Sequence, residues 1–273
     1  MRRRAFTGVK YLVYALLSFN IYMFLQDEMQ ALEYTFSGAI EPGQVIQAFS
    51  ATIDTAAWVL LLLLFELETS VLDDSRITGT LKWALHGVRG FCYLAIGYAF
   101  TGYYAELLTL YDTAAFPATE FCQLLHGGYS MMLEIDTYVP LDSSNCASLV
   151  GNVSRLGDFD VLATQDVLHS ARWLAWTDII NSAAWILVVI VLEIEVRLQL
   201  RGKLSDQIMS LSKYVKVVLY TVLFAAALYW GYAGNFIDVW DASLWLFAFI
   251  FIEMNVFEWQ YETTHDARAA DVE

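Results

Sequence analysis

The stretch that decides the fold is Ile53–Thr69, IDTAAWVLLLLLFELET, which is apolar over most of its length and ends in a Glu-x-Glu pair. A helix needs about 20 apolar residues to cross the hydrocarbon of a bilayer, so this stretch predicts a membrane-spanning helix. Residues 180–196, INSAAWILVVIVLEIEV, match it at seven of seventeen positions, including Ala-Ala-Trp and both glutamates. Hydrophobicity alone does not explain this shared spacing, which indicates an internal repeat.

The composition extends the membrane prediction to the whole chain. Hydrophobic residues make up 58% of the 273 residues and the mean hydropathy is +0.48, whereas a soluble domain contains about 45–50% apolar residues. We therefore expect an all-α integral membrane protein. Six membrane-spanning helices are expected, at residues 9–26, 46–67, 83–108, 172–196, 213–234 and 240–259.

These spans divide the chain into four segments. They are membrane helices one to three (1–108), an extracytoplasmic cap (109–171), membrane helices four to six (172–259) and a cytoplasmic polar tail (260–273). The start, RRR followed by an apolar run, is a pattern that a signal peptide shares with a retained anchor. No small-x-small cleavage site follows, so a retained anchor is expected.

The distribution of basic residues predicts the orientation, because Lys and Arg are enriched in cytoplasmic loops. They gather before the first span, between spans two and three, and between spans four and five, while Arg155 is the one base between residues 112 and 166. Both termini are therefore expected in the cytoplasm, most simply of a bacterial inner membrane. The two repeat copies then run in the same direction, which predicts a parallel repeat of spans 2–3 and 4–5.

The outer segment carries two of the three cysteines, Cys122 and Cys146. An oxidising compartment allows them to form a disulfide, and the alternative is two free thiols. Residues 120–135 and 160–176 have the spacing of short amphipathic helices. The sequence therefore predicts a small helical cap closed by a disulfide.

The Glu-x-Glu endings lie about 20 residues into their spans, where the hydrocarbon ends. The two carboxylates of one pair point about 160° apart around a helix, so they cannot serve one site. One interpretation is structural ion pairing with a charge cluster, and the other is an inner mouth for an ion. The cluster would comprise His86, Arg89, Glu66 and Glu193, and the inner mouth Glu68 and Glu195.

Asp54 and Glu253 are the sharper candidates for an ion pathway, because a carboxylate within the bilayer is expensive and usually faces the bundle interior. Asn181 takes the place of Asp54 in the second copy. Glu253 and Asn20 could form a polar core, and the alternative for Glu253 is a protonated side chain bonded to a neighbouring helix. Glycines in span three, at positions 87, 90 and 97, predict close helix packing there.

The sequence contains no bis-histidine haem pattern, phosphate-binding loop, zinc spacing or catalytic triad pattern. We therefore expect no cofactor, no metal site, no nucleic-acid partner and no enzymatic activity. The expected function is transport of a cation or proton through the lipid bilayer, by a channel or carrier with an acidic outer vestibule. The alternative is an accessory or sensor subunit that binds a partner through the outer cap, with a homo-oligomer or a membrane complex as its setting.

Overall fold

The structure is a computed structural model. It describes residues 2–35, 44–68, 72, 78–117, 120–125, 127–201 and 205–251. Glu253 and the predicted cytoplasmic tail lie outside these residues.

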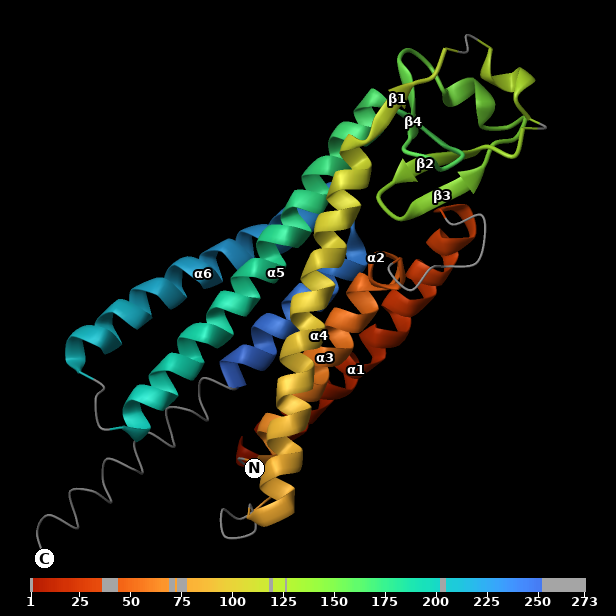
Figure 1. The fold of residues 1–273 in the computed structure, drawn as a ribbon. Helices are drawn as coiled ribbons and strands as arrows, with labels where there is room; N and C mark the ends of the chain where they lie inside the picture. Colours follow the sequence, from red (N-terminus) through yellow and green to blue (C-terminus); the bar gives the residue numbers. More distant parts are fainter. Residues whose placement is uncertain are drawn as a thin grey trace, which may run out of the picture.

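Long helices form most of the described chain and make a bundle with a small sheet at one end (Figure 1). The helices are α1 (Arg2–Thr35), α2 (Val45–Ala48), α3 (Ser50–Glu66), α4 (Gly79–Tyr111), α5 (Gln165–Leu200) and α6 (Asp206–Ala233). A further helix covers residues 236–251. Neighbours along the chain pack together, α1 on α3, α3 on α4, α4 on α5, and α5 on α6.

Three helices in the described part of the chain are long and apolar enough to cross a membrane. They are Thr7–Tyr34, Gln165–Gln199 and Gln207–Ala233. Helix α3 has 17 described residues, and α4 has 33 residues but is rich in glycine and tyrosine. The count of six spans therefore stays a prediction.

Local sequence sets the ends of the two long helices of the second half. The Thr164 hydroxyl accepts a hydrogen bond from the N–H of Val167 at the start of α5, and Asp166 lies in its first turn. The Thr164 hydroxyl satisfies a free N–H group of the helix N-terminus, and the Asp166 carboxylate complements the partial positive charge there. Helix α6 ends at Gly234, whose φ of 91° is in the left-handed region that glycine adopts freely.

The start of α3 is fixed by a side chain from α1. The backbone N–H of Ala51 donates to Glu28 Oε1 at 2.7 Å, and the N–H of Thr52 donates to Glu28 Oε2 at 3.2 Å. A carboxylate at this position satisfies free N–H groups and complements the helix dipole. This contact ties the outer halves of α1 and α3 together.

The segment predicted to form the outer cap contains a five-stranded sheet, so the prediction of an all-α chain with a helical cap is wrong in this segment. The strands lie in the order β1-β4-β5-β2-β3, with β2 and β5 parallel and the other pairs antiparallel. They are β1 (Thr113–Ala115), β2 (Ser130–Glu134), β3 (Thr137–Pro140), β4 (Val153–Leu156) and β5 (Val161–Thr164).

The sheet was missed because its central strands are buried on both faces. Met131 and Leu162 contribute to an apolar core on the outer face, while Met132 and Val161 contribute to a core shared with the helices. Strands buried on both faces read as continuous apolar runs without the alternation that identifies a half-exposed strand. The second predicted cap helix is correct only from Gln165 onward, where α5 begins.

The predicted disulfide between Cys122 and Cys146 is confirmed, with a Cα–Cα distance of 5.0 Å. It joins two short 3₁₀ helices, η3 (Phe121–Gln123) and η4 (Cys146–Ser148). Phe121 and Cys146 are buried in the outer core of the sheet. The bridge therefore closes the outer face of the cap over a core of its own.

Close helix packing occurs at Gly102 of α4. A Cβ at this position would lie 2.6 Å from the carbonyl oxygen of Ile46 and 2.9 Å from the Cβ of Ser50. The glycines expected to pack closely, at 87, 90 and 97, have no described atom within 4 Å of such a Cβ. The close approach therefore lies about a turn or more nearer the sheet than the sequence predicted.

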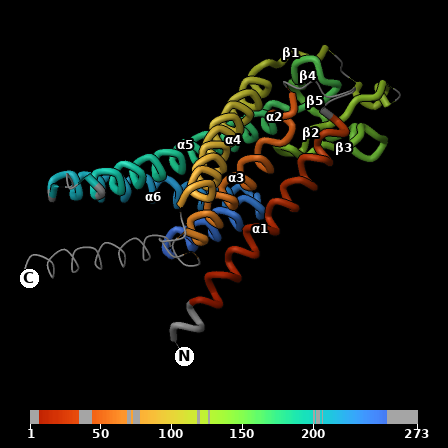
Figure 2. Tube along the Cα trace, turned by 60° about the horizontal axis from the view of Figure 1, so that its bottom comes forward, coloured from red at the N-terminus to blue at the C-terminus, as the bar shows by residue number. Residues whose placement is uncertain are grey.

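The helix at 236–251 joins the two halves of the bundle. The Trp245 ring lies 6.4 Å, between centroids, from both Trp58 on α3 and Trp185 on α5. In the rotated view of Figure 2 this segment, drawn in blue, runs beside α3. Trp245 on this helix therefore lies near the tryptophans of both matching stretches, Trp58 and Trp185.

Candidate functional site

A cavity of about 480 Å³ lies where the outer ends of the helices meet the sheet. Its walls come from α1, α3, α4, α5 and the helix at 236–251, and the β2–β3 hairpin contributes residues 134–138. This volume lies within the range of about 300–1,000 Å³ that small-molecule sites occupy.

Acidic side chains distinguish this cavity from an ordinary packing defect. Its described lining contains nine carboxylates and no Lys, Arg or His. The carboxylates are Asp27, Glu28, Asp54, Glu106, Glu134, Asp136, Asp178, Asp238 and Asp241. They come from six different elements, so only the tertiary fold brings them to one place.

The nearby bases on the sheet side are engaged elsewhere. The Arg172 guanidinium donates to the carbonyl oxygen of Leu110 at 2.9 Å and lies 4.6 Å from the centroid of the Tyr111 ring. Arg155 pairs with Asp160 at 3.1 Å on the sheet. These contacts leave the negative charge of the cavity without a cationic side chain from the described lining.

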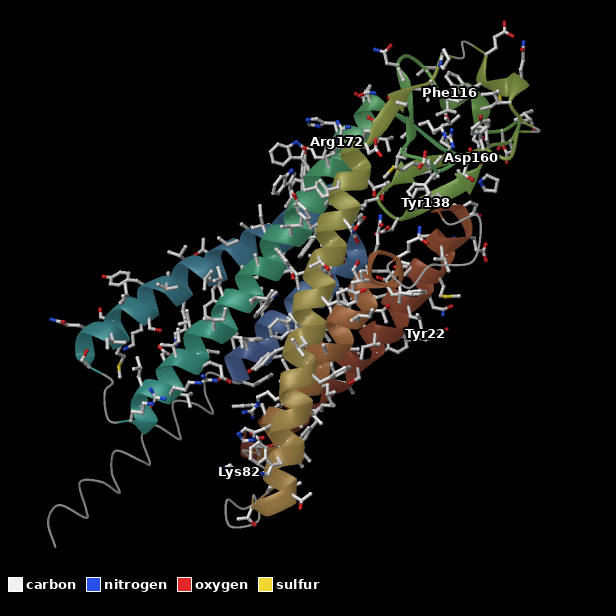
Figure 3. All side chains as sticks on the ribbon, in the orientation of Figure 1. Tyr22, Lys82, Phe116, Tyr138, Asp160 and Arg172 are labelled. Atoms are coloured by element: carbon white, nitrogen blue, oxygen red, sulfur yellow. A yellow bond between two sulfur atoms is a disulfide. The ribbon has the colours of Figure 1, made fainter. Side chains whose placement is uncertain are left out.

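The β2–β3 hairpin forms the roof. Asp136 in its turn has a φ of 58°, a left-handed conformation that Asp tolerates better than most residues. The Asp136 residue is exposed at the turn, but desolvation of its carboxyl group where it lines the cavity, together with repulsion from Asp27, raises the pKa of Asp136 to about 6. Figure 3 shows Tyr138 on the side of the sheet that faces the helices, where its ring lies 6.4 Å from that of Tyr34.

The wall from α3 and α5 contains polar atoms without partners. Tyr103 donates its hydroxyl hydrogen to Asp54 Oδ2 at 3.3 Å, but Asp54 Oδ1 is buried with no hydrogen-bond partner among the described residues. The same holds for Asn181 Oδ1 and Ser182 Oγ, and Ser182 is only 3% exposed. Buried polar atoms are normally paired, so these atoms are available to a ligand or to water.

The inner end of the cavity combines carboxylates with indole rings. Asn20, which is 1% exposed, donates its amide hydrogen to Asp241 Oδ1 at 2.7 Å. Trp58, Trp185 and Trp245 line the cavity at this end. On α5, Asp178 accepts a hydrogen bond from the indole of Trp230 at 3.1 Å.

The structure places the Glu-x-Glu pair of α3 away from this cavity and in separate contacts. Glu66 is buried and accepts hydrogen bonds from Lys10 at 2.6 Å and from Tyr11 at 3.1 Å. Glu68 pairs with Arg89. His86 is exposed, and its Nδ1 lies 2.8 Å from the carbonyl oxygen of Lys82 on the same helix.

The second pair is also engaged. Glu195 pairs with Lys216 at 3.0 Å, and both side chains are nearly buried. Glu193 accepts hydrogen bonds from Tyr93 at 2.9 Å and from Arg197 at 3.3 Å. Each of the four glutamates of the two motifs therefore forms an ion pair with a basic side chain. These contacts favour the structural interpretation of the motifs.

Of the residues expected along an ion path, the cavity contains Asp54 and Asn181, while Glu68 and Glu195 lie outside its lining. The other carboxylates were missed in the sequence because they lie near the ends of apolar runs or in the cap, where exposure to water is the usual explanation for an acid. The signal was available, since the second, third, fourth and sixth expected spans each contain at least one acid and Asp27 and Glu28 directly follow the first. Examples are Glu106 in span three and Asp178 in span four.

Fold and site together define a mostly helical chain, with three helices able to cross a membrane, a disulfide-closed outer sheet and an acidic cavity between them. Comparison with models of known families, with curated proteins and with solved structures finds no match.

Proposed function

We propose that the chain is an integral membrane protein that takes up a cation from its outer side and carries it across the bilayer. The observation that supports this most directly is the cavity with nine carboxylates and no basic residue in its described lining. Burying a carboxylate without a partner is costly, and an opposite charge offsets that cost. A bound cation is therefore the occupant that stabilises this arrangement.

The charge distribution along the bundle supports an orientation with the sheet outside. Lys82 lies at the end of α4 far from the sheet (Figure 3), and it belongs to the basic segment between the second and third expected spans. Basic residues favour the cytoplasmic side. We place both termini in the cytoplasm and the acidic sheet on the opposite side, where it concentrates cations at the cavity.

We also infer that the parallel repeat is a structural one that surrounds the cavity. Residues 127 positions apart contribute equivalent pairs: Asp54 with Asn181, Thr55 with Ser182 and Trp58 with Trp185 all line it. The ion pairs Glu68–Arg89 and Glu195–Lys216 obey the same offset. Superposing α3–α4 on α5–α6 by rotation about the membrane normal tests this, and an inverted relation contradicts it.

The transport proposal is tested by cation flux into liposomes that contain the purified protein. Asp54→Asn is the informative variant, because it copies the residue that the repeat itself carries at position 181. Asp241→Asn removes a second cavity carboxylate, and Glu253→Gln tests the candidate beyond the described residues. We expect the cavity variants to reduce flux several-fold.

The matched control is Asp158→Asn, which removes one carboxylate from an exposed position of the sheet outside the cavity lining. This variant should retain the flux of the parent protein. The proposal fails if the reconstituted protein carries no cation, or if Asp54→Asn and Asp241→Asn carry it as fast as Asp158→Asn.

A second candidate is an accessory or sensor subunit that binds a partner through the sheet. It is favoured by the outer apolar core, which closes around the disulfide and makes the sheet a folded unit on the end of the bundle. Purification from native membranes in mild detergent distinguishes the two candidates. A protein that is recovered without a stoichiometric partner contradicts the subunit role.

A further inference from the structure

We propose that the cavity ligand is a linear aliphatic amine with two or more positive charges, a diamine or polyamine, and not a single metal ion. The inference rests on the proposed function, because it names the class of cation that the cavity binds. It is argued from the spacing of the carboxylates, the unpaired polar atoms of the cavity and its aromatic rings.

The first argument is the spacing of the carboxylates along α1. Asn20 holds Asp241 at the inner end, while Glu28 lies near the roof formed by Asp136. The eight residues from 20 to 28 correspond to about 12 Å along a helix axis. Carboxylates spread over such a distance fit positive charges placed at intervals along an extended chain.

The second argument is that the cavity wall provides polar atoms for amine hydrogens. Ser182 Oγ, Asn181 Oδ1 and Asp54 Oδ1 are buried and without partners among the described residues, and all three residues line the cavity. An ammonium group has hydrogens to donate and no lone pair to accept with. Acceptor oxygens on the wall therefore match the N–H groups of an ammonium.

The third argument is the aromatic content of the inner end. The Trp245 ring lies against both Trp58 and Trp185, and all three residues line the cavity together with Asp241 and Asp54. Indole faces attract organic ammonium groups and also pack against methylene groups. A hydrated metal ion gains little binding free energy from such a wall, whereas an alkylammonium group is stabilised by both the carboxylates and the rings.

The arrangement of the carboxylates also argues against one metal ion. Calcium takes six to eight oxygen ligands at one point, and magnesium about six. No group of three or more His, Cys, Asp or Glu side chains in the described residues converges in a way that holds a metal. The acids are instead spread over a cavity of about 480 Å³, which exceeds the space of a single ion.

The test measures binding to the full chain in detergent or nanodiscs by calorimetry, at fixed ionic strength. The probes are spermidine, hexamethylenediamine, aminohexanol, magnesium chloride and calcium chloride. Hexamethylenediamine and aminohexanol have the same carbon chain, but the second carries one charge. We expect the diamine to bind about tenfold or more tightly than the amino alcohol, because its second charge gains charge-assisted hydrogen bonds.

Variants assign the binding to the cavity. Asp241→Asn and Asp54→Asn should each weaken diamine and spermidine binding by about tenfold, while Asp158→Asn should leave it unchanged. Asp54→Asn guards against misfolding, since the second repeat copy already has Asn at that place. Thermal unfolding of each variant without ligand confirms that it is folded.

The outcomes separate this inference from the proposed function. Equal affinities for the diamine and the amino alcohol, or equal binding by cavity variants and control, overturn the polyamine inference. Cavity-dependent binding of magnesium, calcium or a monovalent ion alone overturns it too, but leaves cation transport standing. If the folded protein binds and transports none of these cations, both proposals fail.

Discussion

The buried ion pair between Lys10 and Glu66 gives a prediction about the bundle whose magnitude follows from the structure. The Lys10 ammonium lies 2.6 Å from Glu66 Oε1, and the two side chains are 9% and 6% exposed. Lys10→Met leaves the Glu66 carboxylate buried without its cation. Removal of one partner of a buried pair usually lowers the free energy of unfolding by about 3–5 kcal/mol.

The neighbourhood of Glu66 places the expected loss at the lower end of that range. Tyr11 and Tyr14 donate hydrogen bonds to the carboxylate at 3.1 Å and 3.5 Å, and both can remain in Lys10→Met. We therefore expect a loss of about 3 kcal/mol. The measurement is equilibrium unfolding of purified protein in mixed micelles with increasing denaturing detergent.

The control is the pair Arg197–Glu193, in which the arginine side chain is 71% exposed. Arg197→Met should lower the free energy of unfolding by no more than about 1 kcal/mol, because water already screens that pair. In the double variant Lys10→Met/Glu66→Gln the cost should be much smaller than the sum of the single costs, since no buried charge remains. Equal losses in Lys10→Met and Arg197→Met, or additive losses in the double variant, would refute this reasoning.

Three further predictions concern helix packing, the disulfide and the roof of the cavity. Gly102→Ala should destabilise the bundle by about 1–3 kcal/mol through overpacking, whereas Gly97→Ala, with open space around it, should be neutral or slightly stabilising in the same unfolding assay. Replacement of both Cys122 and Cys146 by Ser, 24 positions apart, should lower the stability of the sheet by about 2–4 kcal/mol; limited proteolysis should then cleave the sheet faster, and unchanged cleavage contradicts this. The pKa of Asp136, raised to about 6, means that its contribution to stability is present below about pH 4 and is lost as the pH rises through about 6. Asp136→Asn keeps a residue suited to positive φ, so the thermal midpoint should depend less on pH in this window, and an unchanged pH profile contradicts the raised pKa of this carboxyl.

The sequence predicted the secondary structure well where a pattern of apolar residues depends on a single helix. The apolar runs around Trp58 and Trp185 predict helices from composition alone, because a membrane-length apolar segment has few other structures. The disulfide was predictable since Cys122 and Cys146 are the two cysteines of one acidic outer segment. The cap was mispredicted because β2 and β5 are buried on both faces and lack a diagnostic period.

The candidate site was only partly predictable, for a different reason. Asp54 is visible in the sequence because its copy in the repeat is Asn181, and a charge within an apolar run is conspicuous. Asp241 is a single acid at the edge of an expected span, and an acid at such a position is usually interpreted as exposed to water. Its importance comes from Asn20, 221 positions away, which bonds to it within the bundle.

The sequence by itself determined that this chain is rich in long apolar helices, that residues 53–69 and 180–196 match at seven positions, and that residues 109–171 are acidic and contain two cysteines able to form a disulfide. Those properties depend on hydrophobicity, spacing and cysteine count, which are local to the chain. The tertiary structure alone decided that nine acids from six elements surround one cavity and that the Glu-x-Glu glutamates are held in ion pairs. Distances between helices determine both, because a carboxylate is structural or available to a ligand according to whether a base lies within reach.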